Sequence, residues 1–174
     1  MNHWLLTVSE QNFAISKEKR WSVQGFRKAQ KRRVDRMQSG DRLMYYMSDL
    51  RVFAVSATIT SKAFKDTTPV WVGFRDEEDF PYRVRIKPDY VLLEHQFLDA
   101  LQLAPRLEFL KRWPLERWPL AFIGELNLLS RKDYEMLEGE MRRHSSDRPV
   151  GGEWRNRKPE QPGNQLLGTA GDLS

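Results

Sequence analysis

The sequence contains no cysteine and only three histidines among its 174 residues. Without cysteine the chain can form no disulfide, no thiolate metal site and no cysteine nucleophile. The histidines, His3, His95 and His144, lie far apart and show none of the short spacings that metal sites use. We therefore expect neither a metal ion nor a cofactor, and the composition is compatible with a reducing cytoplasm.

The sequence also lacks long apolar runs and the motifs of common enzyme classes. No segment approaches the roughly 20 apolar residues that a membrane span needs. The chain opens directly into the apolar run 3–8 without the layout of a signal peptide. The patterns GxGxxG, GxSxG and the P-loop lysine motif do not occur. These absences predict a soluble, cytoplasmic protein and give no indication of catalysis.

Positive charge is concentrated in one short stretch. Residues 17–36 hold nine Lys or Arg against two acidic residues, a local charge of +7, whereas the whole chain carries +5. Such a concentration is typical of a surface that binds a polyanion, although a solvated helix face is the simpler interpretation. In this stretch we expect seven cations to contact nucleic-acid phosphates: Arg20, Arg27, Lys28, Lys31, Arg32, Arg33 and Arg36.

Hydrophobic periodicity predicts an α+β domain over residues 1–144. We expect strands at 3–8, 42–47, 52–60, 69–74 and 82–87. We expect helices at 9–19, 26–37, 94–101 and 105–112, and a capped helix that begins after Ser130. Residues 122–126 are either a last strand or a crossing loop. Residues 145–174 hold five of the ten glycines and three of the nine prolines, which favours a disordered tail.

The expected strand at 82–87 alternates strictly between apolar and basic residues. Arg83 and Arg85 share one face with Lys87, opposite the apolar face. This basic face is a second candidate for phosphate contact, and a solvated outer face is an equally good interpretation.

Several short motifs occur in a fixed order along the chain. They are Asn2-His3-Trp4-Leu5, Trp21-Ser22-Val23, Gly40-Asp41-Arg42-Leu43-Met44-Tyr45-Tyr46, Phe80-Pro81-Tyr82-Arg83-Val84 and Ile123-Gly124-Glu125-Leu126. In this order, over about residues 1–143, they resemble the EVE domain, a member of the PUA-like superfamily and a relative of the YTH domain. The resemblance implies a mixed β-barrel or strongly curved sheet with packed helices.

The resemblance also implies a site. EVE domains are regarded as readers of modified nucleobases, and a YTH domain holds a methylated base in an aromatic cage. Trp21 and Trp71 would stack on the flipped base, with Phe74 or Phe80 as a third wall. Carried over by position, the expected pocket residues are Trp21, Trp71, Phe74, Phe80, Ser9, Asn12 and Ser22.

The residues and the resemblance together favour a non-catalytic domain that binds DNA or RNA carrying a modified base, a methylated cytosine or adenine. One alternative is an interaction module whose basic helix docks on an acidic protein. Another is a small enzyme on the PUA-like scaffold, for which Asp41, Lys87 and Tyr45 are candidates without a recognisable partner.

Overall fold

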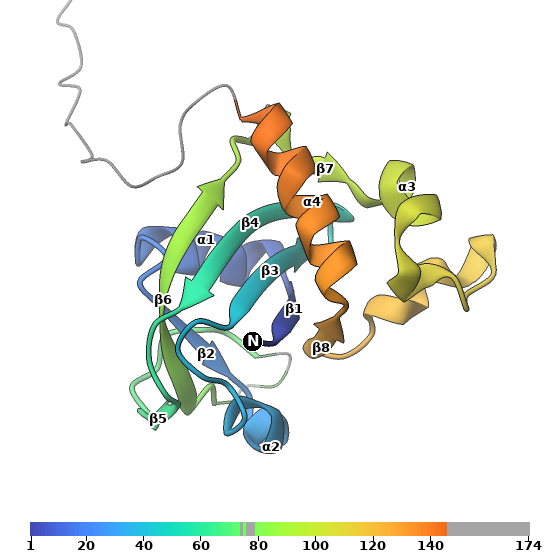
Figure 1. The fold of residues 1–174 in the computed structure, drawn as a ribbon. Coiled ribbons are helices and arrows are strands. Elements are labelled where there is room, and N and C mark those ends of the chain that lie inside the picture. The colour runs from blue at the N-terminus through green and yellow to red at the C-terminus, as the bar shows by residue number, and fades with distance from the viewer. Residues whose placement is uncertain (74, 76–78, 146–174) are drawn as a thin grey trace, which may run out of the picture.

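The computed structural model describes residues 1–73, 75 and 79–145. This part of the chain is built on a curved, mixed sheet whose strands lie in the order β2-β6-β4-β3-β1-β8 (Figure 1). Two short strands extend it, β5 pairing with β6 and β7 with β4. The strands are β1 (His3–Val8), β2 (Val23–Phe26), β3 (Arg42–Met47), β4 (Val52–Ile59), β5 (Phe64–Lys65), β6 (Tyr82–Val91), β7 (Leu98–Asp99) and β8 (Leu126–Leu129). β1 and β3 run parallel, and the other pairs are antiparallel.

Helices cover both faces of the sheet, with α1 on one side and α4 across the other (Figure 1). The α-helices are α1 (Glu10–Glu18), α2 (Lys31–Val34), α3 (Ala100–Leu103) and α4 (Arg131–His144). The 3₁₀ helices are η1 (Lys28–Gln30), η2 (Glu94–Gln96), η3 (Ala104–Arg106), η4 (Glu108–Leu110) and η5 (Leu115–Phe122). Within the described ranges, no helix is both long and apolar enough to cross a membrane.

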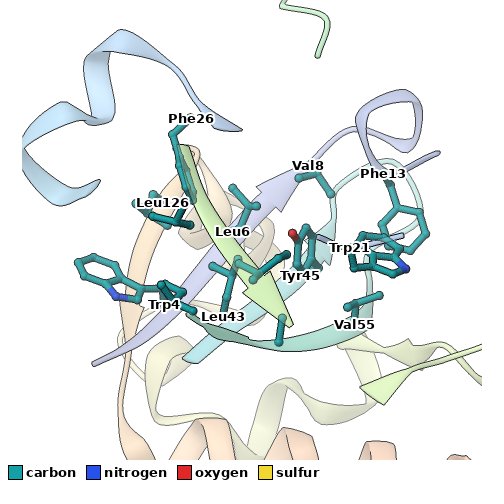
Figure 2. Close-up of a cluster of buried hydrophobic side chains, with 14 of the residues drawn as sticks. Trp4, Leu6, Val8, Phe13, Trp21, Phe26, Leu43, Tyr45, Val55 and Leu126 are labelled. Atoms are coloured by element: carbon teal, nitrogen blue, oxygen red, sulfur yellow. The ribbon is translucent and has the colours of Figure 1, made fainter. Parts of the chain in front are cut away.

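Alternating side chains of the central strands feed two hydrophobic cores. On β3, Leu43 and Tyr45 enter the core that faces α1 (Figure 2), whereas Met44 and Tyr46 enter the core under α4 and η5. Both faces of the sheet are therefore buried. The expected two-sided character of the strand at 3–8 is confirmed, since β1 lies between β3 and β8.

Most of the strongly patterned elements are confirmed. Strands begin at residues 3, 42, 52 and 82 as predicted, although β6 continues to Val91. The closing helix is capped by Ser130, whose Oγ accepts a hydrogen bond from Asp133 N at 3.1 Å. The Asp133 carboxylate accepts hydrogen bonds from the backbone N–H groups of Glu108 and Phe109, at 2.9 and 2.8 Å. The N-terminal end of α4 thereby also fixes η4.

The basic helix predicted at 26–37 is much shorter in the structure. Phe26 ends strand β2, where it pairs with Tyr82 of β6, and the helical part of the stretch is confined to η1 and the four residues of α2. Like charges at i,i+4 spacing disfavour a longer helix, and burial of Phe26 favours the strand. The basic residues consequently lie on a short, irregular ridge.

Several other predicted helices and strands differ from the structure. Residues 69–73 form no strand, and the helices expected at 94–101 and 105–112 are replaced by η2, β7, α3, η3 and η4. The predicted strand or loop at 122–126 leads into strand β8. Phe74 and residues 146–174, which make up almost all of the predicted tail, lie outside the described residues.

Candidate functional site

A cavity of about 510 Å³ lies at the junction between the end of β1 and the start of α1. Elements far apart in the sequence meet around it, because β1 lies beside β8 in the sheet and α1 packs against residues 71–73. Its lining includes Thr7, Val8, Ser9, Asn12, Gln24, Arg27, Tyr46, Arg51, Trp71, Val72, Gly73, Phe80, Phe122, Ile123, Gly124 and Glu125. The cavity combines aromatic, amide and charged groups.

One wall is formed by residues 71–73, which side chains of α1 hold in place. The Asn12 amide donates from Nδ2 to Val72 O and accepts at Oδ1 from Val72 N, both at 2.8 Å. Trp71 Nε1 donates to Ser16 Oγ at 2.9 Å. Asn12 thus supplies the pair of hydrogen bonds that a neighbouring strand would otherwise give. The backbone of Val72 is therefore paired with a side chain, and residues 70–73 form no strand.

The indole of Trp71 lies directly on β2 at Gly25. A Cβ built on Gly25 would come within 2.3 Å of Trp71 Cζ3, so only glycine leaves room for the ring. Trp71 also neighbours Phe80, with ring centroids 6.1 Å apart. Both aromatic side chains line the cavity.

Behind this wall runs a buried chain of hydrogen bonds. Gln24 Oε1 accepts from Ser16 Oγ at 3.1 Å and from Tyr45 OH at 2.8 Å. Gln24 Nε2 donates to Gly25 O at 2.8 Å. Burial raises the pKa of Tyr45 far above its usual range, so the phenol stays protonated and able to donate. The chain fixes the orientation of the Gln24 amide.

The opposite wall comes from the segment before β8, which is attached to β1. Thr7 donates from its backbone N to Glu125 O at 2.9 Å and from Oγ1 to Phe122 O at 3.2 Å. Gly124, with φ of +103°, makes the turn between these two contacts. Phe122 stacks on Tyr46 with ring centroids 3.9 Å apart, and burial raises the pKa of Tyr46 to about 12.

A carboxylate and a guanidinium meet at the edge of the cavity. The Glu125 side chain is only 6% exposed, and its two carboxylate oxygens accept from Arg27 N at 3.3 and 3.4 Å. Arg27 Nε lies 3.9 Å from Glu125 Oε2, and its guanidinium lies 5.8 Å from the centre of the Phe80 ring. Arg27 therefore links the aromatic wall to the basic stretch that follows it.

Trp21, predicted as the first stacking wall, does not line the cavity. It is 3% exposed and lies in the core that faces α1, where its ring makes edge contacts with Phe13 and Tyr45 (Figure 2). Its neighbour Ser22 is exposed and donates from Oγ to Lys19 O at 2.7 Å, closing the turn after α1. The structure thus corrects the predicted places of both residues.

Four of the other predicted pocket residues lie at the cavity, and the fifth, Phe74, is outside the described residues. Trp71, Phe80, Ser9 and Asn12 all line it. The polar groups expected to contact the base nevertheless form hydrogen bonds within the protein. Ser9 Oγ caps α1 by accepting from Asn12 N at 3.1 Å, and the Asn12 amide bonds to the backbone of Val72. Gln24 and Glu125 are lining residues that the sequence did not single out for the pocket, although Glu125 stands in one of the motifs shared with EVE domains.

The predicted phosphate-binding cations form an exposed ridge that begins next to Arg27. We call Lys28, Lys31, Arg32, Arg33 and Arg36 the cationic ridge. Lys31 pairs with Asp35 at 2.6 Å, and this hydrogen bond raises the pKa of Lys31. In the described residues, Arg32 and Arg36 form no ion pair. Arg20 is also exposed, at the turn after α1.

The predicted basic face of β6 is divided. Arg85 and Lys87 are exposed, but Arg83 is only 5% exposed and its guanidinium contacts the segment before β6. This corrects the expectation that Arg83 and Arg85 share one phosphate-binding face. Of the enzyme candidates, Asp41 is buried and accepts hydrogen bonds from Asn2 N and Trp4 Nε1. The described residues contain no cluster of acidic and histidine side chains that could hold a metal ion.

The fold is shared with solved structures of low sequence identity. A YTH domain-containing protein, Mmi1, solved in complex with RNA, matches with a TM-score of 0.57 at 12% identity, over 80% of each chain. A crystal structure of a Pseudomonas syringae protein matches with a TM-score of 0.52 at 15% identity, over 79% of this chain and 97% of that one.

Sequence comparison identifies relatives and a family. A UPF0310 protein of Pyrococcus abyssi is 25% identical over 147 residues, which are 79% of this chain and 98% of that protein. A second UPF0310 protein, from Pyrococcus horikoshii, is 25% identical over 150 residues, covering 79% of this chain and 97% of that protein. The sequence pattern of the EVE domain matches residues 2–120. Because this match spans more than half of the chain, the protein belongs to the EVE domain family.

Proposed function

We propose that this EVE domain is a non-catalytic nucleic-acid-binding domain that takes one modified base, a methylated cytosine or adenine, into the cavity beside Trp71. The observation that carries the proposal is the cavity itself, whose aromatic wall of Trp71 and Phe80 adjoins Arg27 and hence the cationic ridge. The shared fold with Mmi1, solved in complex with RNA, supports a nucleic acid as the partner.

The aromatic wall would contribute base stacking, and the cationic ridge would contribute phosphate contacts. Stacking a base on an aromatic side chain contributes about 1–3 kcal/mol, and extruding a base from a duplex costs a few kcal/mol, so the wall about offsets extrusion. Net affinity must then come from phosphate contacts. The exposed cations of the ridge, Arg32 and Arg36 above all, can supply them.

Selectivity for a modified base would depend on the lack of a free hydrogen-bond acceptor at Gln24. Burying one added methyl group contributes only about 0.8 kcal/mol, roughly a fourfold preference. Unmodified adenine carries one more N–H group than 6-methyladenine, and Gln24 Oε1 cannot accept it because both of its lone pairs already accept hydrogen bonds. A buried N–H without an acceptor costs about 1–3 kcal/mol. The cavity would therefore distinguish 6-methyladenine from adenine mainly by exclusion, whereas 5-methylcytosine would gain only the burial of its methyl group.

Fluorescence anisotropy with labelled oligonucleotides tests the proposal. The probes are short single-stranded DNA and RNA carrying 5-methylcytosine, 5-hydroxymethylcytosine, 6-methyladenine or no modification. We expect at least one modified probe to bind about tenfold more tightly than its unmodified counterpart, a difference of about 1.4 kcal/mol. Equal affinity across the whole panel would contradict modified-base recognition.

Matched variants test the role of Trp71. Trp71→Leu keeps an apolar side chain but removes the stacking face, and Trp71→Phe keeps a smaller face. We expect Leu to weaken binding about tenfold or more and Phe to weaken it less. Trp113→Ala is the control, because Trp113 is 39% exposed and does not line the cavity. Unchanged affinity in Trp71→Leu would overturn the assignment.

A salt titration separates a nucleic-acid partner from an acidic protein partner. Phosphate binding to single strands should lower log K with log[salt] at about −0.7 per neutralised phosphate. A flat salt dependence with every probe would favour the interaction-module alternative.

A further inference from the structure

Arg83 reaches back from β6 to the segment that carries Trp71. Its Nε donates to Phe80 O at 3.1 Å, one terminal nitrogen donates to Thr68 O, and the other lies 3.2 Å from Asp66 Oδ2. The guanidinium also lies 5.2 Å from the centre of the Trp71 ring. We call residues 66–73 the wall segment. Arg83 therefore contacts this segment at Asp66, Thr68 and Trp71, and it also contacts Phe80, which lies just before β6.

Arg83 lies on a strand that is paired on both sides. Its backbone pairs with Gly25 of β2 on one side and Phe64 of β5 on the other. A planar guanidinium holds its donors in a fixed fork, so three directed contacts leave the group little freedom. An arginine that is 5% exposed is costly to bury unless its donors are satisfied, and here they are satisfied by the wall segment and Phe80.

We propose that Arg83 is a positioning residue that presets the aromatic wall of the cavity before a ligand arrives and does not itself contact phosphate. Without the fork, the wall segment keeps the contacts that Asn12 and Ser16 make with Val72 and Trp71. The segment loses its contacts at Asp66 and Thr68, and Phe80 O loses its donor. A ligand would then have to order the wall on binding, and ordering costs affinity.

The first test needs no nucleic acid. Hydrogen exchange measured by NMR reports on the Trp71 indole N–H and the Val72 amide, both of which donate hydrogen bonds. Arg83→Lys keeps the charge but loses the fork, and we expect both protons to exchange about tenfold faster. Arg85→Gln, on the exposed side of the same strand, is the matched control and should leave both rates unchanged.

Core amides distinguish positioning from general destabilisation. The Leu43 and Tyr45 amides of β3 should keep their wild-type exchange rates in Arg83→Lys. The proposal is overturned if the wall protons exchange at the wild-type rate, or if the core amides accelerate by the same factor. Should Arg83→Lys fail to fold, Asp66→Asn removes one tie only, at a half-exposed carboxylate, and is expected to accelerate wall exchange about twofold to threefold. Wild-type wall exchange in Asp66→Asn would then count against the proposal.

The second test measures affinity and rests on the proposed function. Arg83→Lys should bind the preferred modified oligonucleotide about tenfold more weakly with an unchanged slope of log K against log[salt]. Arg85→Gln should instead reduce that slope by about 0.7 if Arg85 meets a phosphate. A reduced slope of log K against log[salt] in an Arg83→Gln variant would show that Arg83 contacts phosphate and would overturn the proposal. If the wild-type protein binds no probe, the proposed function fails, while the exchange result still decides the role of Arg83.

Discussion

Trp21 and Trp71 are both almost completely buried, and both are hydrogen-bonded to Ser16 of α1. Trp21 N donates to the Ser16 carbonyl at 3.1 Å, and Trp71 Nε1 donates to its hydroxyl at 2.9 Å. Arg20 and Trp21 form a turn in which both have positive φ, 55° for Arg20 and 53° for Trp21. The Trp21 ring packs against Tyr45. Trp71 lies on Gly25 and lines the cavity. One indole is therefore enclosed in the core, and the other lines the cavity.

This contrast shows why neighbouring charges do not predict exposure. Trp21 stands among cations in the sequence, yet two consecutive residues with positive φ turn its ring into the core. Such a conformation is costly for residues with a Cβ, and burial of a whole indole offsets the cost. The following changes test the contrast, in order of expected effect.

Trp21→Ala should have the largest effect on stability. Removing a fully packed indole from the core is expected to lower the free energy of unfolding by about 3–5 kcal/mol. Urea denaturation followed by circular dichroism measures it. The affinity of the remaining folded protein for oligonucleotides should change little, because Trp21 does not line the cavity. A loss of stability below about 1 kcal/mol would contradict the core assignment.

Gly25→Ala should disturb Trp71 without touching Trp21. The new methyl group would meet the indole at 2.3 Å, so either β2 or the wall segment must shift. We expect a loss of up to about 3 kcal/mol of stability, together with weaker oligonucleotide binding. Gly139→Ala is a control, since a Cβ there meets no neighbouring atom within 4 Å. Wild-type stability and affinity in Gly25→Ala would show that the ring is not held on β2.

Asn12→Ala should loosen the wall with a smaller loss of stability. The substitution removes two hydrogen bonds to Val72, for a cost of about 1–2 kcal/mol. The Val72 amide should exchange faster, whereas the turn at Trp21 should keep its protection. Asn12→Asp separates the two bonds, since it retains an acceptor for Val72 N and loses the donor to Val72 O. Equal exchange of Val72 in all three proteins would rule out the Asn12 contact.

Arg32→Gln and Arg36→Gln should have the smallest effect on stability, within about 0.5 kcal/mol. Both side chains are exposed on the cationic ridge. Each change should weaken oligonucleotide binding and reduce the salt slope by about 0.7 if its cation meets a phosphate. Lys31→Gln serves as a comparison, because Lys31 is already paired with Asp35 and should contribute less. Unchanged slopes in both arginine variants would remove the ridge from the interface.

Much of the fold could be predicted because burial leaves a local periodic pattern. The strands that begin at His3, Arg42 and Val52 alternate or run apolar, and Ser130 marks the start of α4. The basic helix expected at 26–37 is shorter because Phe26 is buried in strand β2, and the pairing of β2 with β6 joins residues too far apart in the sequence for a local pattern to report it.

Less of the site could be predicted, because its contacts are distant in the sequence. The wall at Val72 depends on Asn12, sixty residues earlier, and no local pattern reports that contact. Arg83 looked like its neighbour Arg85 on an alternating strand, but the segment before β6 folds over one of them. The family resemblance predicted a set of pocket residues of which Trp71, Phe80, Ser9 and Asn12 line the cavity. Trp21 and Ser22, from the same set, do not line it.

The most direct test follows the two indoles during one titration. The Nε1–H resonances of Trp21 and Trp71, assigned with Trp→Phe variants, are recorded by NMR while the preferred modified oligonucleotide is added. A base stacked in the cavity predicts a large shift for Trp71 and almost none for Trp21. A shift at Trp21 with none at Trp71, or no shift at either during saturable binding, would contradict the account.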